Sequence, residues 1–292
     1  MTVPPGLWPR PERAGFRHRV GLRPLDLSSW VVVDDLLGPT LDGKDLLLSQ
    51  RRADVFSAGP GTEAAAAELL ALLVEHLRAD HAGTHGVGDR SVEVAGRRVD
   101  LRALPPLDAA GRLVQDDWCL LDDSGRAVRL VAATLCSPSR WRLADKIGRG
   151  MPEVHAPVPG YAEELETVVD ATLRRLVPAR PVWRSNWTLT DDPALFQPVV
   201  GPPAPVVDAE SAGAHVWLRV ERQTLRRLPR TGAIVFGIRT FQERLDGLAG
   251  RPADAADLLA AVRQLPAATA DYKSLRSHRP HVEAWLARCT NG

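Results

Sequence analysis

Hydrophobic residues recur every three or four positions in two long stretches of the chain, residues 63–78 and 162–176. That spacing is the period of a helix with one buried face. Shorter stretches of the same kind, 254–265 and 281–289, lie near the C-terminus. The apolar faces of the two long predicted helices are formed by Leu69, Leu70, Leu73 and Leu77 in the first, and by Leu165, Val168, Val169, Thr172 and Leu176 in the second.

Other stretches alternate between hydrophobic and polar residues or are rich in β-branched and aromatic side chains, as strands are. Residues 27–35 predict a first strand, and 91–101 and 118–135 predict hairpins that turn at Ala95-Gly96 and at an Asp-Ser-Gly sequence. Further strands are expected at 181–189, 215–225 and 232–241, whereas the proline-rich residues 201–214 predict an exposed connection. Short antiparallel strands with helices outside the hairpins indicate an α+β fold rather than a doubly wound sheet.

The domain organisation that follows is one large domain with small additions. Residues 1–23, rich in proline and arginine, predict an extended arm on the surface, residues 24–250 the main domain, and residues 251–292 a helical C-terminal segment. A length of 292 residues, with 45% hydrophobic and 25% charged residues, is ordinary for a globular protein. A homo-oligomer is compatible with this sequence.

Charge and cysteine content exclude several classes of function. A net charge of +1 disfavours nucleic-acid binding. No apolar run approaches the ~20 residues of a membrane span, and prolines interrupt the N-terminus, so we expect a cytoplasmic protein. The three widely spaced cysteines suit neither a disulfide framework nor a zinc or iron–sulfur site. The motifs of serine hydrolases and Walker-type nucleotide sites are not found.

Cations are concentrated in residues 135–161. Arg140 and Arg142 stand two apart around Trp141, so in an extended segment both guanidinium groups would point to one side and could bind carboxylates or phosphates. A surface ion-pair lattice with Asp145 and Glu153 would explain the same residues. Trp141 is one of eight tryptophans, which either line a pocket for a flat ligand or fill the core. The basic residues of the segment are Arg140, Arg142, Lys146 and Arg149.

His155 is the only histidine of this segment, and the prolines around it restrict the backbone. A fixed imidazole suits a metal or haem iron, but composition alone favours a core histidine that bonds a backbone carbonyl. Cys136 could bind iron as a thiolate, yet its place at the end of an apolar run favours a buried thiol.

Four stretches together resemble the family of haem-dependent oxidative N-demethylase alpha-subunit-like proteins. They are QDDWCLL, CSPSRWRLADKIGRGMPEVHAPVPGY, RPVWRSNWTLTDDPALF and LRVERQTLRRLPRTGAIVFGIRTF, within a resemblance that covers residues 17–241. The resemblance implies a PAS-like antiparallel sheet wrapped by helices that binds one haem b. It also implies oxidation of a secondary methylamine with dioxygen, release of formaldehyde, and electrons from a separate flavin and iron–sulfur reductase that uses NAD(P)H.

Under this resemblance the candidate site residues take specific roles. His155 becomes the axial iron ligand, Arg140, Arg142 and Lys146 become partners of the haem propionates, and Trp141 a wall of the macrocycle. Arg222, Gln223 and Arg239 are assigned to the pocket, where each could face either the propionates or the oxygen-binding side. Asn186 and Tyr161 would orient the amine through an amide carbonyl and a phenol.

Two other functions remain open from the sequence. A non-catalytic PAS-like sensor would bind haem or another small molecule without turnover. An α+β domain with a basic pocket for a dicarboxylate would bind no haem. A haem absorption spectrum separates the haem-binding possibilities from the dicarboxylate domain, and turnover in the presence of a reductant separates the oxygenase from the sensor.

Overall fold

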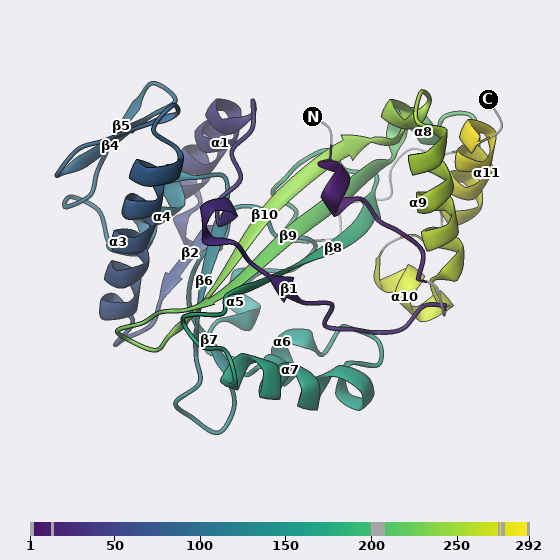
Figure 1. Cartoon of the computed structure of the whole chain (residues 1–292). Coiled ribbons are helices and arrows are strands. Elements are labelled where there is room, and N and C mark those ends of the chain that lie inside the picture. The colour runs from purple at the N-terminus through teal and green to yellow at the C-terminus, as the bar shows by residue number, and fades with distance from the viewer. Residues whose placement is uncertain (1–2, 13–14, 200–207, 274, 276–277, 291–292) are drawn as a thin grey trace.

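An antiparallel sheet runs through the middle of the molecule (Figure 1). The structure is a computed structural model that describes residues 3–12, 15–199, 208–273, 275 and 278–290. Within these residues the sheet has seven strands in the order β1-β8-β9-β10-β6-β7-β2. Their bounds are β1 Arg23–Pro24, β2 Phe56–Ala58, β6 Asp117–Asp122, β7 Arg129–Thr134, β8 Val182–Thr190, β9 Trp217–Arg227 and β10 Ile234–Arg244.

A smaller sheet of three strands, β3 (His85–Val87), β4 (Ser91–Val94) and β5 (Arg97–Asp100), lies at one side of the molecule. Its second hairpin turns at Ala95 and Gly96, whose φ angles are 48° and 75°. Two successive positive φ angles define the tight turn that matches the twist of paired strands. The hairpin predicted at residues 91–101 is therefore confirmed.

Helices cover the main sheet in three groups (Figure 1). The helices of the first group come from the N-terminal part of the chain, those of the second from its middle, and those of the third from its C-terminal part. The first group is α1 (Leu37–Gln50), α2 (Arg52–Val55), α3 (Glu63–Asp80) and α4 (Pro106–Leu113). The second group is α5 (Leu143–Lys146), α6 (Met151–His155), the π-helical turn η3 (Tyr161–Leu165) and α7 (Glu166–Arg174). The third group is α8 (Ala212–His215), α9 (Pro252–Gln264), α10 (Ala267–Tyr272) and α11 (Arg279–Thr290). The short 3₁₀ turns are η1 (Pro5–Leu7), η2 (Leu27–Ser29) and η4 (Leu245–Leu248).

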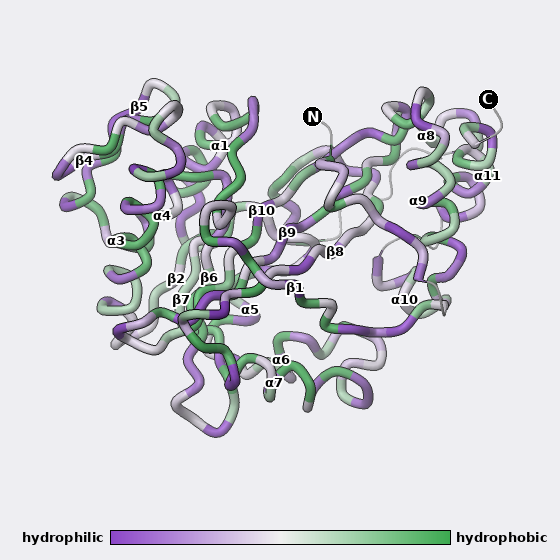
Figure 2. The backbone as a smooth tube through the Cα atoms, viewed as in Figure 1, coloured by the Kyte–Doolittle hydropathy of each residue, from purple (hydrophilic) through white to green (hydrophobic). Residues whose placement is uncertain are grey.

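The two faces of the sheet bury different sets of side chains. On one face, Leu225 and Ile238 pack with Leu143, Met151 and Leu173 of the second helix group. The opposite face is divided between a cluster around α3 and α4 and a cluster around α9 and α11. Figure 2 shows hydrophobic and hydrophilic residues interspersed along the strands of the main sheet.

The predicted α+β class is confirmed, and the two long helices and the strands from residue 118 onward appear where the pattern placed them. The second long helix begins with the π-helical turn, and Val168, predicted on its apolar face, is 51% exposed. The first predicted strand is wrong: after η2, residues 30–34 form no strand. The carbonyls of Ser29, Trp30 and Val32 instead accept hydrogen bonds from arginine side chains.

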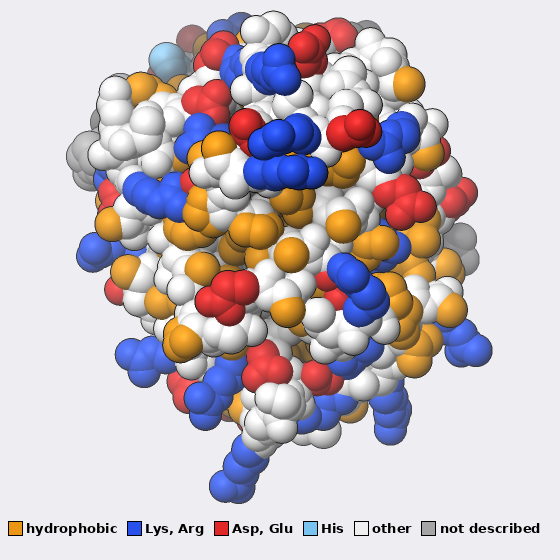
Figure 3. All heavy atoms as spheres, turned by 90° about the vertical axis from the view of Figure 1, so that its left-hand side faces the viewer, with side chains coloured by type: hydrophobic (Ala, Val, Ile, Leu, Met, Phe, Trp, Pro, Cys, Tyr) orange, Lys and Arg blue, Asp and Glu red, His pale blue; other side chains and the backbone are white. Residues whose placement is uncertain are grey.

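The N-terminal arm is only partly a surface segment. Val3, Leu7 and Trp8 are buried in the cluster that contains α9, and Trp8 Nε1 donates to the carbonyl of Asp254 at 3.1 Å. No helix among the described residues combines the length and the apolar character needed to span a membrane. The side of the molecule that carries α3 exposes a band of hydrophobic side chains below a row of cations (Figure 3), and α3 itself turns Ala64, Ala67 and Ala71 outward.

Candidate functional site

Strand register brings four polar side chains onto the face of the sheet that α5–α7 cover. Arg184 of β8 lies opposite Gln223 of β9, and Asn186 lies opposite Glu221. Directly opposed residues of paired strands share a face. Leu225, two residues after Gln223, packs against the second helix group, so the four polar residues lie on the same side as His155.

His155 ends α6 and is held from two directions. Its Nδ1 lies 2.9 Å from the carbonyl of Met151, which can only accept, so Nδ1 carries the proton. The ring stacks on Tyr161 with centroids 4.6 Å apart and an interplanar angle of 11°. Burial lowers the pKa of His155, the Met151 bond opposes this, and the charges of Lys146 and Arg184 lower it further. The neutral ring therefore presents Nε2 as a free lone pair.

Two cations next to this imidazole have no acid partner. Among the described residues, neither the Lys146 ammonium nor the Arg184 guanidinium makes a hydrogen bond or ion pair, and Arg184 Nε is fully buried. Lys146 Nζ lies 4.4 Å from the centre of the Trp141 ring. Burial lowers the pKa of Lys146 to about 8 and also lowers the pKa of Arg184, and Glu221 opposes both shifts. Buried charges without partners are costly, so this arrangement is suited to an anionic ligand.

Glu221 is the acid of this face. Its Oε2 accepts a hydrogen bond of 2.9 Å from Gln223 Nε2, and within the described chain it has no ion pair. Lys273, at the end of α10, reaches the same strands: its Nζ donates to Asn186 Oδ1 at 3.2 Å. Lys146, Arg184 and Lys273 against one carboxylate leave an excess of two positive charges on this face.

Tyr161, a predicted site residue, contributes a second unsatisfied group. Its side chain is buried, and its hydroxyl has no hydrogen-bond partner among the described residues. Burial raises the pKa of Tyr161 to about 12, with further contributions from the Glu166 and Asp170 charges. The phenol therefore stays protonated and can donate a hydrogen bond to a ligand.

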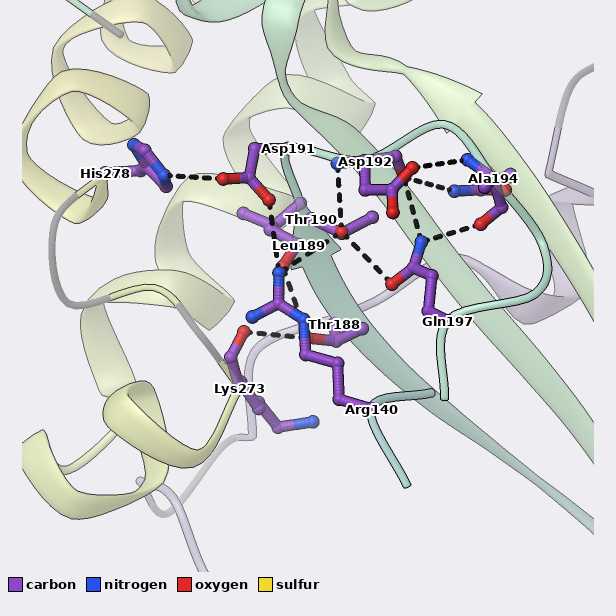
Figure 4. Close-up of polar contacts among 11 residues, drawn as sticks. Arg140, Thr188, Leu189, Thr190, Asp191, Asp192, Ala194, Gln197, Lys273 and His278 are labelled. Atoms are coloured by element: carbon purple, nitrogen blue, oxygen red, sulfur yellow. Dashed lines mark hydrogen bonds and ion pairs between the residues drawn. The ribbon is translucent and has the colours of Figure 1, made fainter. Parts of the chain in front are cut away.

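Arg140 and Arg142 do not join this group. Arg140 adopts a positive φ of 60°, and its Nη2 lies 3.2 Å from Asp191 Oδ1, while the other carboxylate oxygen, Oδ2, lies 3.3 Å from His278 Nε2. Figure 4 shows Arg140 inside this network, which ties the end of β8 to the C-terminal segment. The Arg142 side chain is exposed and has no hydrogen-bond or ion partner in the described part of the chain.

Arg222 and Arg239 lie on the opposite face of the sheet. Arg222 donates to the carbonyls of Trp30 and Ser29 at 3.0 and 2.6 Å. Arg239 donates to the carbonyl of Val32 at 3.3 Å and to Asp34 at 2.7 Å. Both guanidinium groups therefore hold the segment that follows η2, and they cannot reach the side that carries His155.

Cys136 does not offer a thiolate. It is buried, and burial raises its pKa to about 12, with the Asp117 charge acting in the same direction. The interpretation as a small buried thiol is therefore supported.

Sequence reasoning passed over Arg184, Glu221 and Lys273. A signal existed for Glu221, because it is the only acid in the basic stretch from Arg219 to Arg230. Arg184 and Lys273 gave no comparable signal, since only strand pairing and the position of α10 bring them to this face.

The fold and this face define a class: an α+β domain with a fixed imidazole and unpaired cations on one side of an antiparallel sheet. The family model described as haem-dependent oxidative N-demethylase, alpha subunit-like, matches residues 21–283. The match spans most of the chain and includes every residue of the site. The protein belongs to this family.

Proposed function

We propose that the His155 face binds haem b and that the protein oxidises the N-methyl group of a small amine with dioxygen. One observation carries this proposal: Nδ1 of His155 is fixed by Met151, Nε2 is free, and two unpaired cations lie beside it. A metal-bound histidine usually donates its other nitrogen to a carbonyl in this way. The two cations, Lys146 and Arg184, match the two negatively charged haem propionates in number.

The residues divide into an iron side and a carboxylate side. His155 would hold the iron, and Lys146 and Arg184 would hold the propionates, because the described residues offer neither cation another acceptor. Trp141, which contacts the Lys146 ammonium, would contribute an aromatic wall. Arg222 and Arg239 are not included, because carbonyls and Asp34 already use them.

When bound, haem would supply activation of dioxygen, with electrons from a separate reductase that uses NAD(P)H. Glu221, fixed by Gln223, can accept a hydrogen bond from a protonated amine. The Tyr161 phenol can donate one, since its hydroxyl is free. The Asn186 carbonyl, in contrast, already accepts from Lys273.

The first test is a haem titration followed by absorption spectroscopy. We expect a Soret band in the wild-type protein and its loss or shift in His155→Ala, because the axial nitrogen is removed. His281→Ala serves as the matched control, since His281 lies on α11, away from this face, and should leave the band unchanged. A wild-type protein without a Soret band would refute the proposal.

The carboxylate side is tested separately. Arg184→Gln should weaken haem binding by about tenfold, or about 1.4 kcal/mol, because one charge-assisted hydrogen bond is lost. Haem dimethyl ester, which has no propionate charge, should bind the wild-type protein more weakly and should no longer distinguish the variant. If Arg184→Gln lost the same affinity for haem as for its dimethyl ester, Arg184 would not be a partner of a propionate.

A further inference from the structure

The chain contains very few primary amines. Of its 37 lysine and arginine side chains only three are lysines, Lys44, Lys146 and Lys273. None of the three is an exposed residue. Lys44 is buried and donates to the backbone carbonyls of Val114 and Asp116, and Lys146 lies over Trp141. A reaction that needs a primary amine therefore has few positions available in this protein.

The Lys273 amine has two hydrogen-bond acceptors. Its Nζ donates to Asn186 Oδ1 at 3.2 Å and to the backbone carbonyl of Trp187. A neutral amine has two N–H bonds and one lone pair, so these two acceptors use both protons. An ammonium would have a third N–H, for which the described residues offer no oxygen acceptor, and the centre of the Trp187 ring lies 5.0 Å from Nζ. The lone pair of the neutral amine is thus left unused.

The surroundings of Lys273 increase the fraction of its neutral form. Burial lowers its pKa to about 8; the Glu221 carboxylate opposes this shift and the Arg184 charge adds to it. At pH 7 about one tenth of the side chain would then be neutral, far more than for an ordinary lysine. The backbone carbonyl of Lys273 accepts a hydrogen bond of 2.8 Å from Thr188, which fixes the start of the side chain against β8 (Figure 4).

Lys273 also lies on the side of the sheet where the proposed reaction takes place. Asn186, its partner, is opposite Glu221, on the face that carries His155. Oxidation of an N-methyl carbon ends in formaldehyde, the smallest aldehyde, which reacts with amines. We infer that Lys273 captures this formaldehyde reversibly as a covalent adduct, an inference that takes the source of the aldehyde from the proposed function.

The capture step needs no other reactant. The Lys273 nitrogen forms a bond to the carbonyl carbon, the C=O π bond opens, and one amine proton moves to the oxygen, which gives a carbinolamine. Loss of water then gives the imine, and addition of water returns formaldehyde and the amine. No electrons are gained or lost, so the adduct can form and hydrolyse without a redox partner.

The test supplies formaldehyde directly and therefore requires no turnover. The haem-loaded protein and the haem-free protein are incubated with ¹³C-formaldehyde and cyanoborohydride, whose hydride reduces the imine to a stable N-methyl group. Peptide mass spectrometry then locates the labelled residue. We expect Lys273 to be labelled in both forms, about tenfold or more faster than Lys44, because Lys273 is half-buried whereas Lys44 is buried and paired with Asp117.

Lys146 and a designed variant provide the controls. Asn186→Asp would pair the Lys273 ammonium with a carboxylate, raise its pKa, and slow labelling at pH 7.5 by about tenfold. Lys273→Met should abolish labelling at that position, with circular dichroism as the check of folding. If this variant does not fold, peptide mass spectrometry of the labelled wild-type protein still shows whether Lys273 is modified. Labelling of Lys146 or the N-terminal amine with Lys273 unmodified would overturn the inference.

Failure of the inference and failure of the proposed function give different results. If Lys146 binds a propionate, haem should protect Lys146 but not Lys273 from methylation. If haem leaves Lys146 labelling unchanged and no Soret band forms, the proposed function fails, while the labelling of Lys273 is judged by itself. If haem protects Lys146 and Lys273 stays unmodified, only the inference fails.

Discussion

At the scale of single residues, the buried carboxyl group of Asp116 has a protonation state that depends on pH. Asp116 is 0% exposed, and neither of its carboxylate oxygens has a hydrogen-bond partner among the described residues. Burial raises the pKa of Asp116 to about 6, although the Arg239, Arg222 and Lys44 charges act against this. Its ordinary pKa is 3.8, so the folded protein binds this proton more tightly than the unfolded chain does.

Asp116→Asn should therefore change the pH dependence of stability. The neutral carboxyl favours the fold at low pH, and this contribution is lost as pH rises from about 4 through about 6, by roughly 3 kcal/mol for about two pKa units. Urea unfolding at pH 4.5 and 8 measures the effect. The asparagine variant, which cannot ionise, should gain stability relative to wild type at pH 8. Parallel pH profiles for the two proteins would contradict this expectation.

At the scale of elements, close packing between strands restricts which side chains can be present. A Cβ atom on Gly237 of β10 would lie 2.6 Å from Thr224 Oγ1 of β9 and 2.7 Å from the ring of Trp118 of β6. Both distances are far below contact distance, and the three strands are paired at these residues. The glycine is needed for space and not for backbone conformation, since its φ is not positive.

Gly237→Ala should destabilise the protein by about 1–3 kcal/mol, because the strands or the Trp118 ring must move. Gly43→Ala is the matched control: Gly43 lies in α1, and nothing stands within 4 Å of its added Cβ. That substitution should stabilise the fold by about 0.5–1 kcal/mol through helix propensity. Thermal unfolding of the two variants should shift in opposite directions, and a decrease in both would argue against this packing.

At the scale of the whole molecule, the three cysteines differ in how far the fold must open before their thiols can react. Cys119 and Cys136 are buried on the main sheet and beside α2, whereas Cys289 of α11 is half-buried. Burial raises the pKa of all three thiols. Reaction with an alkylating reagent needs the exposed thiolate, so burial controls the order of reaction.

Iodoacetamide should modify Cys289 first in the native protein. Cys119 and Cys136 should react only when the sheet opens, at a rate that increases with urea concentration. Mass spectrometry of timed samples measures the order. Rapid modification of Cys136 in the absence of denaturant would indicate that its cluster opens separately from the rest of the molecule.

The sequence predicted those parts of the fold that local patterns specify. Helix α3 was predicted because its leucines recur at helical spacing, and the hairpin at Ala95-Gly96 because that pair suits a tight turn. Helix α1 gave no such signal, since Gly38, Pro39 and Gly43 interrupt it. It forms because Leu41 and Leu48 are buried and because Lys44 bonds the carbonyls of Val114 and Asp116.

The sequence by itself determined the α+β class, the confirmed strands and the segment that carries His155, because periodicity, turn residues and motifs are properties of neighbouring positions. Only the tertiary structure decided which cations share a site. Arg140 and Arg142 are close to His155 in sequence but do not lie beside it, whereas Arg184 comes from a distant strand and does. The reason is physical: strand register and the packing of distant segments decide which face a side chain occupies, and one residue of shift reverses that face.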